Sequence, residues 1–250
     1  MTLGRFVVAS RFRGPRDSGN GGYTAGRIAE IAGFSPARVT LLAPPPLEEE
    51  LTVEESERGI VARKQDGSVV AACKPGRVEV AIPAMPAVDD ARDASTRFLM
   101  SDYHIFPDCF TCGTARHHDG GLCIHPGPLK GSRTVATLWT PESSLPASEG
   151  ALDAAIVWAA LDCPGAFGCM GDTIRPLVLA RMCAAIHEPV RVGDELVVLG
   201  WPVQSDGRKE HVGSAIYASD GRLLASAESL WIAIAEDHSD FAVAKSSRSP

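Results

Sequence analysis

The sequence lacks the features that mark several large classes of protein. No apolar run approaches the roughly 20 residues that a membrane-spanning helix needs. The apolar stretch near the N-terminus is too short for a signal peptide and has basic residues on both sides. The net charge is -7 at pH 7 and no basic stripe is present, which argues against nucleic acid and acidic membrane surfaces as partners. We therefore expect a cytoplasmic protein that binds neither nucleic acid nor membrane.

Motifs of common nucleotide-binding and hydrolase sites are also missing. The chain has no Gly-x-Ser-x-Gly motif, no phosphate-binding loop and no dinucleotide-binding fingerprint. These absences exclude the serine hydrolases with that motif, the P-loop NTPases and the Rossmann oxidoreductases. The seven cysteines are an odd number scattered through segments that resemble core, a pattern that favours reduced thiols over a disulfide framework. We expect no cofactor.

What the chain does contain is an internal repeat. Residues 49–82 and 194–234 follow one plan: an acid-Glu-Leu-x-Val start, a middle strand, an Asp-Gly turn and a long final strand. The Asp-Gly pairs, at 66–67 and 220–221, lie between alternating apolar stretches and are strong hairpin signals. With 45% hydrophobic residues in 250, the chain can bury a sizeable core. The repeat predicts two halves with the same architecture.

A helix is expected ahead of the strands in each half. Residues 21–32 show a loose amphipathic stripe. Residues 150–162 are apolar almost all the way round, which is typical of a helix buried inside a fold. One helix wrapped by a curved antiparallel sheet is the α+β arrangement called the hotdog fold, and two in tandem join their sheets edge to edge, removing exposed edge strands. The predicted fold is a tandem, or double, hotdog.

These elements suggest a division of the chain. We expect an N-terminal hotdog half at 1–82 and a C-terminal half at 134–236. Between them lies a linker, 83–133, that is rich in Pro, Gly, Asp and His and carries a Cys/His-rich loop. Polar residues close the sequence at 237–250, which we expect to be a flexible tail.

Glycines gather where the first helix is expected to start, within residues 14–33. The side chain of Asn20 or Ser18 is a natural N-cap, and Gly21 and Gly22 leave backbone N–H groups uncovered by any Cβ. Because these groups lie at the positive end of a helix, they suit a carbonyl oxygen that gains negative charge during attack. The alternative is that the glycines only allow the helix to pack closely against its sheet.

Asp162 is a candidate general base. It is expected at the C-terminal end of the buried helix, on the face that carries Trp158 and Ala155. An apolar environment and the negative helix end would both raise its pKa. The alternative is that Asp162 forms a turn before residues 163–165, where a proline should end the helix.

The linker carries a candidate metal site. Cys109, Cys112, Cys123 and His125 offer four soft or borderline ligands, and the Cys-x2-Cys spacing is a usual half of a tetrahedral zinc site. The spacing of the second half is unusual. Reduced cysteines that pin a loop to the core are the alternative.

Several segments together resemble a known family. Residues 12–30 look like the opening helix of acyl-CoA thioesterase-like double-hotdog proteins, in which a His/Asn-Gly-Gly start is typical. Residues 156–165 look like the second-half helix of that family, and 190–203 with 213–234 resemble its final strands. The resemblance covers nearly the whole chain, with the linker matching least, and it points to relatives of the type-II acyl-CoA thioesterases.

The resemblance implies roles for individual residues. Asp162 would position or activate water against the thioester carbon, and the N–H of Gly22, with Gly21, would hold the oxyanion. The carboxylate and the helix start would come from different halves and meet at their interface. Other contacts to the substrate are expected from Asn20, Gly21, Tyr23 and Trp158.

The sequence departs from the family pattern at one point. In the type-II enzymes a Gln and a Thr on later strands support the catalytic Asp. The closing strand here offers Ser226, Glu228 and Ser229 near the Gln position and no clear Gln. This departure bears directly on hydrolytic competence.

Three functions follow from these observations. The first is hydrolysis of an acyl-CoA or acyl-carrier thioester by water activated at Asp162. The second is hydration or dehydration of a thioester, which normally needs a His paired with an acid, and neither helix start supplies a His. The third is a non-catalytic acyl-thioester binding protein. The family resemblance also implies a homodimer or higher homo-oligomer.

Overall fold

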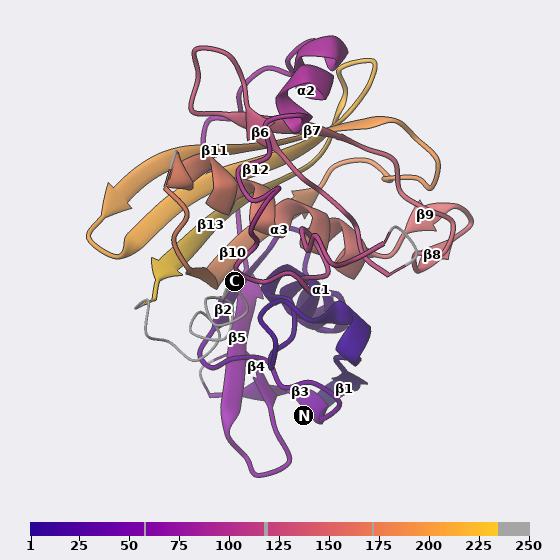
Figure 1. Cartoon of the computed structure of the whole chain (residues 1–250). Helices are drawn as coiled ribbons and strands as arrows, with labels where there is room; N and C mark the ends of the chain where they lie inside the picture. The colour runs from indigo at the N-terminus through magenta and orange to yellow at the C-terminus, as the bar shows by residue number, and fades with distance from the viewer. Residues whose placement is uncertain (58, 118–119, 172, 235–250) are drawn as a thin grey trace.

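The protein is built on one large antiparallel sheet with two central helices, as a computed structural model shows (Figure 1). The structure describes residues 1–57, 59–117, 120–171 and 173–234. The N-terminal half contains β1 (Thr2–Val7), a short 3-10 turn (Ser10–Phe12), α1 (Gly21–Ala32), β2 (Ala37–Leu41), β3 (Glu50–Ser56), β4 (Gly59–Arg63) and β5 (Val69–Pro75). Then follow α2 (Val88–Ser95), β6 (Gly127–Pro128), β7 (Val135–Trp139), β8 (Ala147–Ser148), β9 (Ala151–Leu152), α3 (Ala154–Met170), β10 (Leu177–Ile186), β11 (Leu196–Asp206), β12 (Lys209–Ala218) and β13 (Leu223–Ala233).

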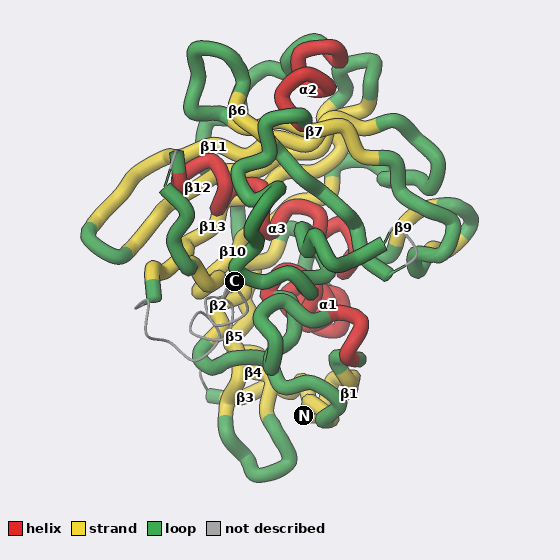
Figure 2. Tube along the Cα trace, in the orientation of Figure 1, coloured by secondary structure: helices red, strands yellow, loops and turns green. Residues whose placement is uncertain are grey.

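The two halves share a single eleven-stranded sheet. Its strand order is β1-β3-β4-β5-β2-β10-β13-β12-β11-β7-β6. The halves meet where β2 pairs antiparallel with β10, in a register that runs from Arg181 opposite Thr40 to Ala184 opposite Ala37. Each half thereby removes one exposed edge of the other, and this confirms the predicted edge-to-edge joining. Figure 2 shows the strands curving around the two helices at the centre.

The first predicted helix is confirmed, because α1 spans Gly21–Ala32 as expected. It lies directly against α3, and the contact depends on small residues. A Cβ built on Gly22 would lie 2.6 Å from the Trp158 carbonyl oxygen, and one on Gly26 would lie 2.7 Å from the Ala155 Cα. These distances are shorter than any normal van der Waals contact, so both positions require glycine for the helices to approach this closely.

The second helix differs from its prediction. It starts at Ala154 and continues to Met170, through Pro164. Every residue from Ala155 to Met170 is buried, and this apolar burial outweighs the hydrogen bond that proline removes. The hydroxyl of Ser214 donates to the Leu161 carbonyl at 2.6 Å, giving the turn before the proline an extra partner. The expected helix end at 163–165 is therefore wrong.

The hairpin predictions are confirmed, but one strand is shorter than expected. Both Asp-Gly turns adopt the positive φ that favours glycine, +85° at Gly67 and +94° at Gly221. The strand after the first turn ends at Pro75 rather than continuing to residue 82. A Cβ on Gly76 would lie 2.9 Å from the Arg38 nitrogen, so the chain presses onto the seam between the halves here and leaves the sheet.

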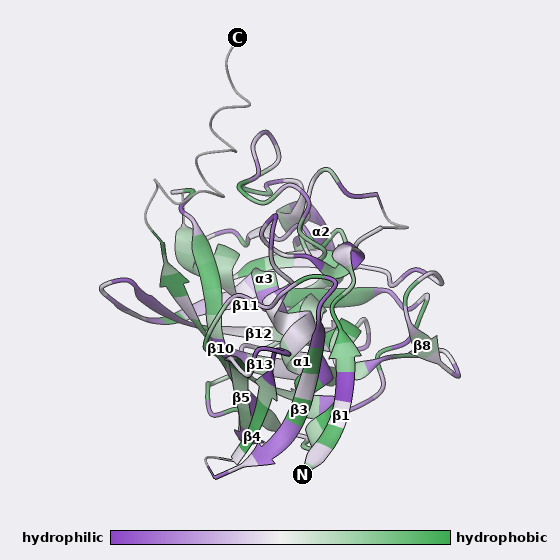
Figure 3. Cartoon of the chain, turned by 90° about the horizontal axis from the view of Figure 1, so that it is seen from below, coloured by the Kyte–Doolittle hydropathy of each residue, from purple (hydrophilic) through white to green (hydrophobic). Residues whose placement is uncertain are grey.

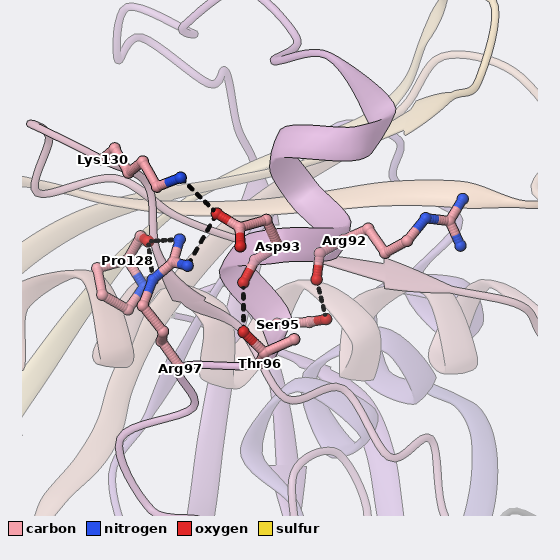
Figure 4. A network of polar contacts seen from close by, with 7 residues as sticks. All are labelled: Arg92, Asp93, Ser95, Thr96, Arg97, Pro128 and Lys130. Carbon is pink, nitrogen blue, oxygen red and sulfur yellow. Dashed lines mark hydrogen bonds and ion pairs between the residues drawn. The ribbon is translucent and has the colours of Figure 1, made fainter.

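The segment between the halves contains α2, which lies on the outer side of β7 (Figure 1). Asp93 on α2 forms ion pairs with Arg97, at 2.9 Å, and with Lys130, at 3.2 Å (Figure 4). The Arg97 guanidinium also donates to the Pro128 carbonyl at 2.9 Å. These contacts connect α2 to the short strand β6. The predicted tail, 237–250, lies outside the described residues.

The core lies between the sheet and the two helices. β1 and β3 carry both hydrophobic and hydrophilic residues along their lengths (Figure 3), and on β3 the side chains of Leu51 and Val53 are fully buried. This alternation places one face of each strand against α1. Among the described residues, no helix is long and apolar enough to cross a membrane.

Candidate functional site

Asn20 sets the start of α1. Its Oδ1 accepts a hydrogen bond from the Tyr23 N–H at 2.8 Å, so it is the N-cap. Its Nδ2 donates to the Thr111 hydroxyl oxygen at 3.2 Å, and the Thr111 hydroxyl in turn donates to the Ala159 carbonyl of α3 at 2.8 Å. Asn20 therefore links the start of α1 through Thr111 to α3. Thr111, which lies inside the Cys-x2-Cys motif, was not identified from the sequence.

The backbone of α1 reaches Asp162 directly. The Gly22 N–H donates to Asp162 Oδ2 at 3.1 Å. Of the four N–H groups that a helix start leaves without intrahelical partners, those of Asn20, Gly22 and Tyr23 have partners here. The Gly21 N–H has none among the described residues. In this structure Gly22 holds the carboxylate, and Gly21 is the N–H that remains available.

Asp162 lies in the middle of α3, not at its end. Its side chain is 2% exposed. Burial raises its pKa to about 7, against opposing hydrogen bonds from the Gly22 N–H and the Asn20 amide. The predicted contribution of the helix end is wrong, because the helix runs on to Met170. Within the described part of the chain, Oδ1 has no hydrogen-bond partner.

A cavity of about 530 Å³ opens beside this carboxylate. Asn20, Gly21 and Asp162 form a polar part of its lining, here called its polar end, and come from both halves as predicted; Asp17 and Ser18 also line the cavity. Its size is in the usual range for small-molecule sites. The rest of the wall is largely apolar and includes Leu41, Leu42, Pro44, Pro45, Phe106, Leu177, Leu179, Trp231, Ile232 and Ile234. The arrangement can bind an apolar chain with a polar reacting group against Asp162.

Tyr23 and Trp158 lie elsewhere. Tyr23 stacks on Phe12, with ring centroids 4.0 Å apart, and is 8% exposed. Trp158 is 4% exposed and packs against Gly26 of α1. Neither side chain lines the cavity. Their placement is that of core residues that position α1 and α3.

Three cysteines line the cavity next to Asp162. The Sγ atoms of Cys109, Cys112 and Cys163 lie within 4.8 Å of one another, and all three residues are buried. The Cys109 and Cys163 sulfurs are 3.7 Å apart. Hydrogen bonds from the Cys112 and Cys163 thiols hold the pKa of Cys109 well below its usual range. Cys163, which follows Asp162 on α3, was not predicted as part of this group.

The predicted ligand set is not assembled. Cys123 is half-buried and its thiol donates to the Arg116 carbonyl at 3.8 Å. The His125 ring packs on Phe98, with centroids 4.8 Å apart. In the described residues, the group able to hold a metal contains Cys163 in place of these two. The tertiary structure explains this difference, because the loop of residues 109–112 packs on α3. Sequence spacing does not predict that contact.

The closing strand does not supply a polar partner to Asp162. Ser226 Oγ lies 2.9 Å from His187 Nε2, and Glu228 pairs with Arg38 at 2.7 Å. Ser229 and Glu228 line a separate pocket of about 140 Å³. On β13 it is Trp231 and Ile232 that face the large cavity. The polar groups that reach Asp162 are instead the Gly22 N–H and the Asn20 amide.

Comparisons with solved structures identify the fold. A hot dog fold protein from Alicyclobacillus acidocaldarius superposes with a TM-score of 0.61 over 92% of each chain, at 16% identity. A TesB protein of Mycobacterium avium subspecies paratuberculosis gives 0.60 at 14% identity, covering 93% of this chain and 94% of that one.

The chain has a double-hotdog fold. A third neighbour with this arrangement is an acyl-CoA thioesterase II, TesB2, from Mycobacterium marinum, with a TM-score of 0.59 over 92% of each chain at 13% identity. The sequence matches no family model, and no curated protein matches it significantly. At these identities the likeness establishes the fold alone.

Proposed function

We propose that the protein hydrolyses an acyl thioester. The observation that carries the proposal is the Asp162 carboxylate, which has one oxygen held by the Gly22 N–H at 3.1 Å and the other unpartnered, beside an apolar cavity of about 530 Å³. A thioester combines an apolar acyl chain with a reactive carbonyl, and the cavity offers an apolar wall with one polar end. The double-hotdog neighbours that are named as thioesterases support the same reading.

We assign the following roles in the reaction to the groups at the polar end. A water molecule donates a hydrogen bond to Asp162 Oδ1, which holds it in position. It then attacks the thioester carbon while the carboxylate takes its proton. The carbonyl oxygen gains negative charge, and the Gly21 N–H at the start of α1 stabilises it. The carbon–sulfur bond then breaks, and the leaving thiolate takes the proton from the Asp162 carboxyl group. The products are a carboxylic acid and a free thiol.

The test is release of thiol from acyl-CoAs, from acetyl to palmitoyl, by the wild type and Asp162→Asn. We expect the variant to lose activity by a factor of roughly 100 or more, which corresponds to about 2.7 kcal/mol of barrier. Asp153→Asn is the matched control, because Asp153 is the N-cap residue of the same helix and its side chain makes no capping hydrogen bond. An Asp162→Asn variant with wild-type turnover would overturn the assignment.

Absence of thiol release from every acyl-CoA by the wild type would refute CoA-thioester hydrolysis. The next probe is then an acyl group on a carrier protein, assayed by mass spectrometry of the carrier. Equilibrium binding of a non-hydrolysable acyl-CoA analogue to the wild type then identifies a binding protein, because binding without thiol release shows a cavity that holds the ligand and does not hydrolyse it.

A further inference from the structure

Three cysteines lie beside the cavity, and the proposed hydrolysis does not use them. Cys109 and Cys112 come from the segment between the halves, and Cys163 comes from α3. All three are buried, and each offers a sulfur within 4.8 Å of the other two. Residues more than 50 positions apart are thus brought to one point by the tertiary structure. The remaining buried cysteines, Cys73, Cys169 and Cys183, are not part of this group.

The distance between the Cys109 and Cys163 sulfurs matches that between two ligands of one metal ion. A tetrahedral zinc site with Zn–S bonds of about 2.3 Å places its sulfurs about 3.8 Å apart. The Cys109 and Cys163 sulfurs are 3.7 Å apart. A disulfide needs about 2.05 Å, so these two thiols are not bonded to each other.

The surroundings of the cluster also fit a metal site. The Asn20 amide lies 3.9 Å from Cys109 Sγ as a hydrogen-bond donor, in the way that outer partners orient metal ligands. Asp162 Oδ1, which is buried and has no partner in the described chain, lines the same cavity as the three sulfurs. A buried polar atom without a partner is uncommon, and a water or hydroxide on a metal would satisfy it.

We propose that Cys109, Cys112 and Cys163 bind one zinc ion through three thiolates, with the fourth coordination position facing the cavity. Thiolate donors select soft or borderline metals, and zinc is the one that takes them in tetrahedral geometry without redox chemistry. Three protein ligands with one open position distinguish this site from a closed structural site. The proposal does not depend on thioester hydrolysis, because it rests on the sulfur geometry and on the groups around the sulfurs, and no step of the reaction enters it.

The first test is the metal content of protein purified under reducing conditions without chelators. We expect one zinc per chain in the wild type, and loss of zinc in Cys109→Ser, Cys112→Ser and Cys163→Ser. Cys73→Ser and Cys169→Ser are matched controls, since they also remove buried thiols but should retain zinc. Asp162→Asn should retain zinc as well, which separates failure of this proposal from failure of the proposed function.

The second test uses the wild type only, so it does not depend on the variants folding. Addition of Co²⁺ to the reduced, metal-free protein should give a thiolate-to-cobalt charge-transfer band and the visible bands of tetrahedral cobalt. Zinc should displace both. Wild-type protein with neither bound zinc nor a charge-transfer band with Co²⁺ would overturn the proposal. A Cys109–Cys163 disulfide in peptide mapping under non-reducing conditions would also overturn it.

Discussion

Gly22 packs against α3 so closely that a side chain does not fit between the two helices. A methyl group at position 22 would lie 2.6 Å from the Trp158 carbonyl oxygen and 2.7 Å from the Asp162 Cβ. Neither atom is the far end of a flexible side chain, so the two helices must move apart. Overpacking costs about 1–3 kcal/mol, and two contacts this short place the cost in the upper part of that range, about 2–3 kcal/mol. Better helix propensity returns about 1 kcal/mol. Gly22→Ala should therefore lose about 1–2 kcal/mol of stability.

The same substitution should also damage the site. Separation of the helices draws the Gly22 N–H away from Asp162 Oδ2, and misplacement of a catalytic group by about 1 Å costs up to about 100-fold in rate. Gly26→Ala is the matched control, because its Cβ would lie 2.7 Å from the Ala155 Cα, one turn farther from the carboxylate. The two variants are expected to lose similar stability but different amounts of activity.

The assay pairs thermal unfolding with thiol release. Both variants should unfold roughly 2–8 °C below the wild type, while Gly22→Ala alone should lose a further ~10–100-fold in kcat. Equal activity of the two variants would refute the role of the Gly22 N–H in holding Asp162. An unchanged Tm in both would refute the close helix contact itself.

Three further predictions concern the cap, the cavity and the buried thiols. Asn20→Ala should lower the free energy of unfolding, measured in urea, by about 1–3 kcal/mol, because the cap and its hydrogen bonds are lost. Asn20→Ser keeps a capping oxygen and should lose less stability. Equal losses in the two variants would contradict the capping role. Leu179→Trp should fill the part of the cavity beside Gly21, where the Leu179 side chain lies, and lower kcat/KM for short and long acyl-CoAs alike by about tenfold or more. Unchanged kcat/KM would place the reacting carbonyl elsewhere. Burial raises the pKa of Cys73 and of Cys169 to about 12. Both thiols should therefore stay unmodified by iodoacetamide at pH 8 in the native protein and react in urea. Modification of the native protein to the same extent as in urea would contradict their burial.

Local pattern was enough to predict much of the architecture. The repeated strand plan and the two Asp-Gly turns predicted hairpins that the structure contains, because turn chemistry and alternation act over a few residues. The start of α1 was predicted to the residue, since the Asn20 cap and the following glycines are local signals. The edge-to-edge joining of the two sheets was predicted from the need to cover exposed edges, and the structure shows that β2 and β10 are the strands that meet.

The ends of elements depended on contacts that the sequence does not display. Pro164 lies inside α3 because burial of the whole helix outweighs one lost hydrogen bond. The strand after the first Asp-Gly turn stops at Pro75 because Gly76 meets the seam between the halves. In both places tertiary packing overrode a local preference.

The candidate site divides in the same way. Asp162 and the glycines at the start of α1 could be chosen from the sequence by residue type and helix position, and the structure brings them together. The Gly22 N–H proved to be occupied by Asp162, and Cys163 proved to lie with Cys109 and Cys112. Sequence alone determined which residues have the chemistry, because side-chain type and short spacing are local. Only the tertiary structure decided which of them meet, since that depends on how α3 packs against segments far away in the chain.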